Sequence, residues 1–183
     1  MRPEILFKLF TPNKQLPGVG PRINALLTNV AGAHIADLLW LLPNNFIDRR
    51  FCPLIGEAPN GKICTFIVTV IEHIPSPTRK RPYRVICSDE SGLVELVYFN
   101  ARSDYLHEIL PINEKRIISG KVDVFNDRVQ VMHPDHVVKE EDKALILTVE
   151  PVYPLTQGLT GKVLRRCIHH ALKLTPNLPE WLD

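Results

Sequence analysis

Residues 62–133 contain a series of short segments that are rich in β-branched and aromatic residues and that end at turn residues. Segments of this composition between turns are typical of β-strands. One turn is expected at Glu90-Ser91-Gly92 and another at Asn126-Asp127. The strands are expected at 62–71, 83–89, 93–99, 116–125 and 128–132. This middle section restricts the chain to folds that are built on a β-sheet.

One predicted helix interrupts the strands. Residues 103–110 read SDYLHEIL, in which Tyr105, Leu106, Ile109 and Leu110 fall on one helical face. The order of elements is therefore β-β-β-α-β-β, which is the order of an OB-fold, a five-stranded Greek-key barrel. We expect an α+β, mainly β protein with an OB-fold barrel at its centre.

The segments on either side of the strands are expected to be helical or irregular. Residues 16–42 are predicted to form two short helices, and a further helix is predicted over 161–174. Residues 43–61 and 134–160 carry many proline and glycine residues and are expected to be irregular. The expected domains are an N-terminal helical segment at 1–61, the OB-fold at 62–138, and an extended linker with a helix at 139–183.

The sequence LPGVGP at 16–21 is similar to the hairpin of a helix-hairpin-helix motif. In such a hairpin, glycine residues let backbone amides approach a phosphate at the start of a helix. A packed helix entry that supports the next domain explains the same residues at least as well. The sequence therefore leaves open whether Gly18 and Gly20 contact DNA.

Composition excludes several classes of protein. The 22 Lys and Arg residues exceed the 20 Asp and Glu residues by two, which is too small a charge to indicate a nucleic-acid partner. No run of 18 apolar residues exists, so no membrane-spanning segment is expected. The four cysteines include no C-x-x-C pair, which argues against a zinc ribbon or a thioredoxin-like site. Unpaired cysteines favour a reducing cytoplasm.

No catalytic or metal centre is expected. Residues 56–62 have the spacing G-x-x-x-x-G-K, but Ile63 stands where a phosphate-binding loop needs Ser or Thr. Residues 158–162 do not match a phosphate-binding loop either, because Val163 stands where Ser or Thr is needed. The sequence His-Pro-Asp-His at 133–136 has no further metal ligand at a convincing spacing. We therefore expect neither a cofactor nor a metal in this chain.

The loop between the first two expected strands is basic and carries one aromatic residue. An OB-fold often uses this loop for nucleic acid, since Lys and Arg neutralise phosphates and an aromatic ring stacks on bases. A solvated turn is the alternative interpretation. Lys121 and Arg128, on the fourth and fifth strands, either extend the basic surface or are ordinary exposed residues. The residues of the loop that could bind DNA are Arg79, Lys80, Arg81, Tyr83 and Arg84.

Alternation along the third strand separates its two faces. Val94, Leu96 and Tyr98 are expected to fill the barrel, while Glu95 and Phe99 lie on the outer face. Phe99 is followed at once by Asn100, Arg102 and Tyr105, so an exposed Phe99 would form a stacking platform beside them. The alternative is that Phe99 caps the core and Tyr105 packs the helix onto the barrel. Periodicity alone leaves both open.

Several sequence motifs, taken together and in this order, resemble one known family. They are LPGVGPRINALL, the pattern DLL-x-LLP-x-x-F-x-DR at 37–49, YFN at 98–100, MHP at 132–134 and PVYPLT at 151–156. Together they are similar to the N-terminal part of the bacterial ATP-dependent DNA helicase RecG. The resemblance extends from about Leu16 to about Leu172.

The resemblance implies a wedge domain, an OB-fold that splits the strands of a branched DNA. In that family two motor domains follow, which bind ATP and Mg²⁺ and drive the remodelling of replication forks and Holliday junctions in DNA repair and recombination. This chain without a motor is expected to have no activity alone. The family's stacking residues lie just after the third strand, where Phe99 matches the first aromatic. Tyr105 is a looser match because Ala101-Arg102-Ser103 precede it.

The resemblance also implies partners and a location. Branched DNA is the expected partner, with single-stranded-DNA-binding protein as a further candidate, in a monomer of the bacterial cytoplasm that associates with the nucleoid. The alternative is a generic OB-fold module that binds single-stranded DNA or a protein and has no preference for junctions. A nucleotide-dependent enzyme is disfavoured by Ile63 and Val163.

Overall fold

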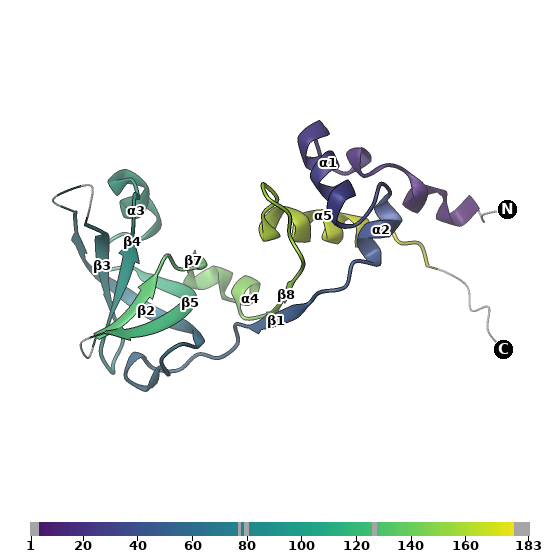
Figure 1. Ribbon diagram of the computed structural model, residues 1–183. Helices are drawn as coiled ribbons and strands as arrows, with labels where there is room; N and C mark the ends of the chain where they lie inside the picture. Colours follow the sequence, from purple (N-terminus) through teal and green to yellow (C-terminus); the bar gives the residue numbers. More distant parts are fainter. Residues whose placement is uncertain (1–3, 77, 79–80, 126–127, 178–183) are drawn as a thin grey trace, which may run out of the picture. The chain divides into compact units, whose positions relative to one another are not determined.

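The chain folds into two compact units. The computed structural model describes residues 4–76, 78, 81–125 and 128–177 (Figure 1). One unit, here called the barrel unit, comprises Ile47–Glu150, and the other, the helical unit, comprises Met1–Phe46 and Pro151–Asp183. Each unit contains its own hydrophobic core, and the two are described separately below.

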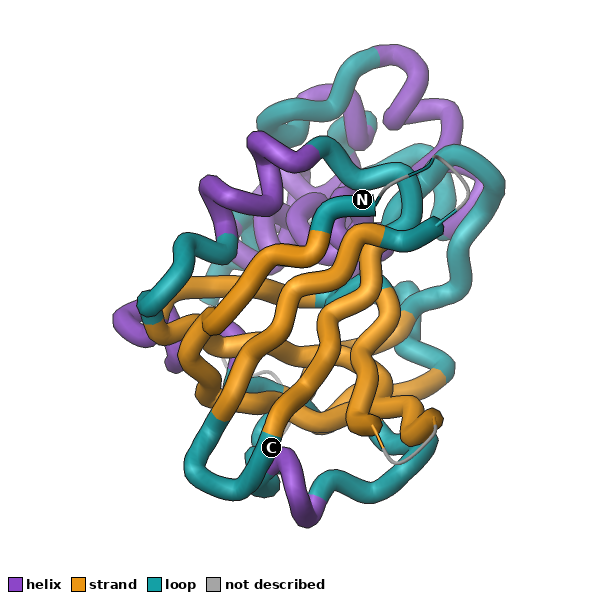
Figure 2. Tube along the Cα trace, turned by 90° about the vertical axis from the view of Figure 1, so that its left-hand side faces the viewer, coloured by secondary structure: helices purple, strands orange, loops and turns teal. Residues whose placement is uncertain are grey.

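Five strands of the barrel unit close into a barrel. Their order is β2-β3-β4-β6-β5, and a further pairing of β2 with β5 completes the circle (Figure 2). The β4–β6 pair is parallel and the other pairs are antiparallel. The prediction of an OB-fold barrel is therefore confirmed. The strands are β2 (Ile63–Ile74), β3 (Tyr83–Ser88), β4 (Leu93–Tyr98), β5 (Lys115–Phe125) and β6 (Arg128–Met132), and β7 (His136–Lys139) adds to the edge of β5.

Strand β2 closes the barrel because it is long enough to pair on both sides. Its first half pairs with β5 and its second half with β3, and the register shifts between Val70 and Glu72. Close packing at the crossing of β5 and β6 depends on Gly120, where an added Cβ atom would lie 2.6 Å from Cγ1 of Val131. Helix α3 (Ser103–Ile109) connects β4 to β5 and buries Leu106 and Leu110 in the barrel core.

Arg49 links the segment through which the chain enters the barrel unit to the segment through which it leaves. Its side chain is buried, with 3% of the residue exposed. It donates hydrogen bonds to Glu150 at 2.6 Å, to Asp135 at 3.0 Å and to the Ser119 hydroxyl at 3.1 Å. A guanidinium group can make all of these bonds at once because its donors point in several directions. The arginine that ends the sequence motif at 37–49 therefore has a structural role in the barrel unit.

The helical unit joins both ends of the chain in one core. Leu27, Leu38, Leu164 and Cys167 are fully buried in this core, and α5 contacts α2. The structure thus groups residues 151–177 with the N-terminal helices, whereas the sequence suggested a separate segment at 139–183. Residues 47–61, expected in the first segment, belong to the barrel unit. The helices are η1 (Glu4–Phe10), η2 (Asn13–Gln15), α1 (Pro21–Val30), α2 (Ile35–Leu39) and α5 (Gly161–Lys173).

The stretches expected to be irregular contain short elements as well. They were not predicted because each has only three or four residues and no periodicity can be recognised over such a length. Strands β1 and β8 pair with each other in a separate sheet. The elements are β1 (Asn45–Asp48), η3 (Ile55–Glu57), η4 (Glu140–Asp142), α4 (Lys143–Ile146) and β8 (Val149–Val152). In the part of the chain that the structure describes, no helix is long and apolar enough to span a membrane.

Candidate nucleic-acid interface

Phe99 is exposed at the end of β4. The residues expected to fill the barrel do so, since Val94 and Leu96 are fully buried and Tyr98 is 8% exposed. Strand alternation places the next side chain outside the barrel, and Phe99 is 46% exposed. Of the two interpretations left open by the sequence, the structure therefore supports an exposed Phe99 and not a Phe99 that caps the core.

His133 contacts Phe99 from the end of β6. The backbone N–H of Phe99 donates to Nε2 of His133 at 3.2 Å, and the two ring centroids lie 5.7 Å apart with 33° between the ring planes. The backbone N–H of His133 donates in turn to the carbonyl oxygen of Val97 at 2.9 Å. Sequence reasoning considered His133 only as a metal ligand, although the MHP motif at 132–134 was a signal for another role. Among the described residues, no group of three or more potential metal ligands occurs.

An open groove crosses the outer face of the barrel beside Phe99. Its volume is about 640 Å³. The groove contains two further apolar side chains that the sequence analysis did not single out, since Phe125 is 62% exposed and Met132 is 51% exposed. Phe125 ends β5 and Met132 ends β6, so only closure of the barrel brings them to Phe99. The residues that line the groove are Ile74, Pro75, Arg81, Pro82, Arg84, Glu95, Val97, Phe99, Phe125, Gln130 and Met132.

Glu95 lies on the outer face of β4, as expected, but it is buried rather than solvated. Only 7% of the residue is exposed. Arg128 and Gln130 each donate a hydrogen bond to its carboxylate at 3.0 Å, and Arg84 Nη1 lies 3.7 Å from it. Side chains of the neighbouring strands β3 and β6 therefore cover it. Two of the predicted DNA-binding arginines thus share one carboxylate, which reduces the positive charge of the groove.

Tyr83 differs from the expectation that it stacks on bases. It is 5% exposed, because β3 alternates in the same way as β4 and directs this side chain into the core. Its hydroxyl lies 3.0 Å from Nδ1 of His73 and 3.3 Å from Nε2 of His107. Burial lowers the pKa of His73, against the raising effect of its hydrogen bond to the Leu110 carbonyl, and His107 lowers it further. Tyr83 therefore belongs to a buried polar chain and not to the interface.

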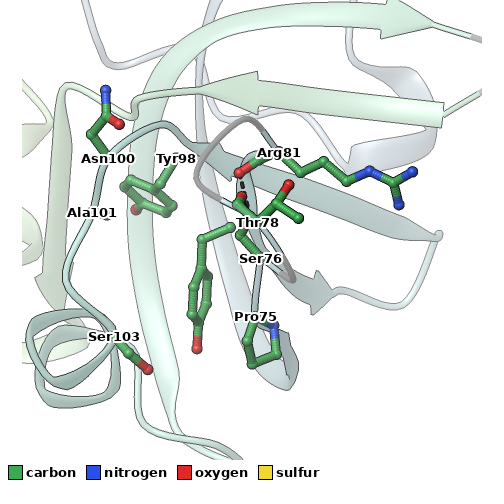
Figure 3. A pocket seen from close by; sticks show the side chains of 9 residues that line it. Pro75, Ser76, Thr78, Arg81, Tyr98, Asn100, Ala101 and Ser103 are labelled. Carbon is green, nitrogen blue, oxygen red and sulfur yellow. Dashed lines mark hydrogen bonds between the residues drawn. The ribbon is translucent and has the colours of Figure 1, made fainter.

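A second, smaller hollow lies where β4 leads into α3. Figure 3 shows Asn100, Tyr98, Ala101 and Ser103 on one side of it and Ser76, Thr78 and Arg81 on the other. Its volume is about 290 Å³. The hydroxyl of Tyr98 is buried and has no hydrogen-bond partner among the described residues. Burial raises the pKa of Tyr98, and Cys87 and Tyr105 add to this effect. Arg81 lines both this hollow and the groove, so it lies on the wall between them.

The other predicted site residues are dispersed. Asn100, Arg102 and Tyr105 are exposed, and Tyr105 is 56% exposed on α3 without lining the groove. Lys121 is exposed on β5, where it pairs with Ile63, and does not line the groove either. Arg128 contacts the groove only through Glu95. Arg79 and Lys80 lie outside the described residues.

In the helical unit, the LPGVGP sequence forms the entry to α1. Leu16 and Val19 are buried in the unit's core, and Gly20 is the N-terminal cap of α1. Gly18 has a φ of 73°, and a Cβ atom there would lie 3.2 Å from Nη2 of Arg166. These contacts account for the glycine and apolar residues of the hairpin as a packed helix entry. Of the two interpretations that the sequence left open for Gly18 and Gly20, these contacts favour the packed helix entry over DNA contact.

Comparison with known proteins gives consistent matches. The model of the family described as "RecG wedge domain" matches residues 12–175. The ATP-dependent DNA helicase RecG of Escherichia coli (strain K12) is 28% identical over 165 residues, which are 89% of this chain and 24% of that protein. The protein of the same name from Bacillus subtilis (strain 168) is 27% identical over 172 residues, 90% of this chain and 24% of that protein.

A solved structure described as RecG bound to a three-way DNA junction has the same fold. It superimposes with a TM-score of 0.79 at 22% sequence identity, over 94% of this chain and 24% of that chain. The chain thus spans about a quarter of the length of the relatives that it matches.

Proposed function

The chain belongs to the RecG wedge domain family, and on this basis we propose that it binds branched DNA and separates the strands at the branch point. The observation that carries the proposal is the exposed Phe99, which stands at the end of β4 beside a groove lined by apolar and basic side chains. An aromatic ring that projects from a rigid strand end can stack on the last base pair of a duplex. The groove then receives one of the separated strands.

The free energies of base stacking and of base-pair opening limit how far this wedge can separate strands without a motor. Stacking on an aromatic side chain contributes about 1–3 kcal/mol per base. Opening one base-pair step costs about 1.4 kcal/mol. The two are similar, so Phe99 can compensate for the opening of one step and leaves no surplus for continuous unwinding. Continuous unwinding would need energy from ATP hydrolysis, which we assign to motor domains of the whole protein together with its ATP and Mg²⁺. For this chain we propose no cofactor.

For the whole protein we propose the remodelling of replication forks and Holliday junctions in DNA repair and recombination. Support comes from the helicase relatives, whose length is about four times that of the matched region. A monomer in the bacterial cytoplasm, associated with the nucleoid, fits this role. Single-stranded-DNA-binding protein is a further candidate partner.

Charged side chains of the groove make a modest contribution to the proposed DNA binding. Arg84 and Arg128 share the Glu95 carboxylate, and Arg81 is the groove arginine that forms no ion pair within the described part of the chain. Each phosphate neutralised lowers log K by about 0.9 per log unit of salt for a duplex and about 0.7 for a single strand. We therefore expect a shallow salt dependence, and a preference for junctions that arises mainly from stacking.

The alternative function is a generic OB-fold module that binds single-stranded DNA or a protein. The groove supports this function as well, because Phe125 would also stack on an unpaired base and Met132 would pack against it. Such a module has no reason to prefer a branch point over a single strand. Preference for a junction over both plain duplex and single strand therefore separates the two functions.

Fluorescence anisotropy tests the proposal directly. The 183-residue chain is titrated onto a labelled three-way junction, a duplex and a single strand, each at two salt concentrations. Phe99→Ala should weaken junction binding by about 5- to 150-fold, the range that corresponds to one lost stacked base. Phe51→Ala is the matched control, because Phe51 is 47% exposed in the same unit and does not line the groove. Equal binding to all three DNAs, unchanged by Phe99→Ala, would exclude the wedge.

A further inference from the structure

Two segments that are 34 residues apart in the sequence meet at the proposed wedge residue. The parallel pairing of β4 and β6 ends at Val97 opposite Met132. His133 follows directly and donates its backbone N–H to the Val97 carbonyl. This register brings the imidazole to the first residue beyond the end of β4, where the N–H of Phe99 donates to Nε2 at 3.2 Å. The pairing of the strands therefore determines which side chain contacts Phe99.

The backbone on both sides of this contact adopts an unusual conformation. Asn100 has a φ of 57° and His133 has a φ of 45°. Non-glycine residues rarely adopt positive φ, and such positions persist only where the surrounding structure enforces them. The His133 ring lies 5.7 Å from the ring of Phe99 and contacts the Tyr98 ring edge-on at 6.0 Å. Phe99 is thus held in two ways, through its backbone N–H and through its ring.

We propose that His133 is a positioning residue for Phe99, which holds the wedge residue in the orientation that stacks on DNA. The proposal rests on the proposed function. A nitrogen that accepts an N–H hydrogen bond needs a free lone pair, so the imidazole is neutral and carries its proton on Nδ1. His133 acts through Phe99 and needs no contact with DNA of its own. Loss of one such hydrogen bond corresponds to about a 2- to 13-fold change in an equilibrium constant.

A double-mutant cycle separates positioning from direct contact with DNA. Junction and duplex affinities are measured for the wild-type chain, His133→Ala, Phe99→Ala and the double variant. We expect His133→Ala to lower the junction preference by about 3- to 10-fold. We expect no further loss when the same substitution is made in the Phe99→Ala background. An equal loss in both backgrounds would overturn the proposal, because His133 would then act on DNA independently of Phe99.

A conservative variant tests the hydrogen bond itself. Glutamine carries an amide oxygen at about the reach of Nε2, while alanine has no acceptor, and both must adopt the same positive φ. The comparison of His133→Gln with His133→Ala therefore cancels the backbone strain. We expect His133→Gln to recover most of the junction preference. Identical behaviour of the two variants would overturn the role of the acceptor.

Nuclear magnetic resonance observes the contact without DNA. The ¹⁵N shifts of the His133 ring should show a proton on Nδ1, and the amide of Phe99 should be protected from hydrogen exchange. In His133→Ala the protection should be lost at Phe99 while that of Leu96, in the middle of β4, is retained. An unprotected Phe99 amide in the wild-type chain would overturn the proposal.

If instead Phe99→Ala leaves junction binding unchanged, the proposed function fails, and the positioning role fails with it. An additive cycle with an effective Phe99→Ala refutes only the role of His133.

Discussion

Replacement of Arg49 tests whether a single buried side chain secures the barrel unit. The Arg49 side chain is 4% exposed and binds Glu150, whose side chain is 13% exposed. Removal of one partner from a buried ion pair typically costs about 3–5 kcal/mol. Glu150 keeps a contact with Nε2 of His136 at 3.4 Å, which places the expected cost at the lower end of this range. The Asp135 partner is 48% exposed, so its contribution is small. We therefore expect Arg49→Met to lower the free energy of unfolding of the barrel unit by about 3 kcal/mol.

The assay must report on the barrel unit alone. Both tryptophans, Trp40 and Trp181, lie outside Ile47–Glu150, so tryptophan fluorescence does not monitor the barrel. Hydrogen exchange of the amides of β2 and β5 measures its opening free energy directly. Urea unfolding followed through the nuclear magnetic resonance signals of the same amides gives a second value, from the midpoint and slope.

Arg50→Met is the matched control for this prediction. Arg50 directly follows Arg49 in the sequence, and its partner is Asp48, with both side chains more than half exposed. We expect no measurable change in exchange or in the urea midpoint for this variant. Equal destabilisation by Arg49→Met and Arg50→Met, or none by either, would refute the argument from burial.

Three further predictions concern the barrel unit. Tyr83→Phe should lower the free energy of unfolding by about 1 kcal/mol, whereas Tyr98→Phe should leave it unchanged or raise it. Within the described residues the Tyr83 hydroxyl has hydrogen-bond partners and the Tyr98 hydroxyl has none. Urea unfolding compares the two variants. Burial lowers the pKa of His73 below its ordinary value of 6.5, so the unfolded chain binds more protons and stability falls as the pH drops below 6.5. Urea midpoints at several pH values should show a weaker pH dependence for His73→Gln. Glu95→Gln should free Arg84 and Arg128 from their shared carboxylate, which tightens single-strand binding and steepens its salt dependence in anisotropy titrations.

Much of the barrel could be predicted because its signals are local. The strands expected at 83–89, 93–99 and 128–132 agree closely with β3, β4 and β6, and α3 lies where its apolar pattern indicated. The same alternation that placed Tyr98 in the core also places Tyr83 there, together with Val85 and Cys87. The position of Tyr83 beside a basic loop favours the interface, whereas the strand pattern favours the core, and the structure agrees with the strand pattern.

The rest of the candidate site depends on contacts between distant segments. Phe125 and Met132 are ordinary apolar residues in the sequence, and only the order β4-β6-β5 brings their strands to the side of Phe99. Glu95 is buried because side chains of two neighbouring strands cover it. The packing of α5 against the N-terminal helices could likewise not be predicted from the sequence. An apolar stripe indicates that one face of a helix is buried but does not identify the surface that covers it.

Local sequence patterns leave open whether Phe99 is exposed, but they are sufficient to predict the type and order of the main elements and the face of β4 on which Phe99 lies. These properties follow from side-chain period and backbone preference, which act between near neighbours in the chain. Contacts between distant segments determine which arginines are neutralised, which groups surround the Tyr83 hydroxyl, and that His133 contacts Phe99. These contacts arise from strand register and barrel closure, which join residues far apart in the sequence.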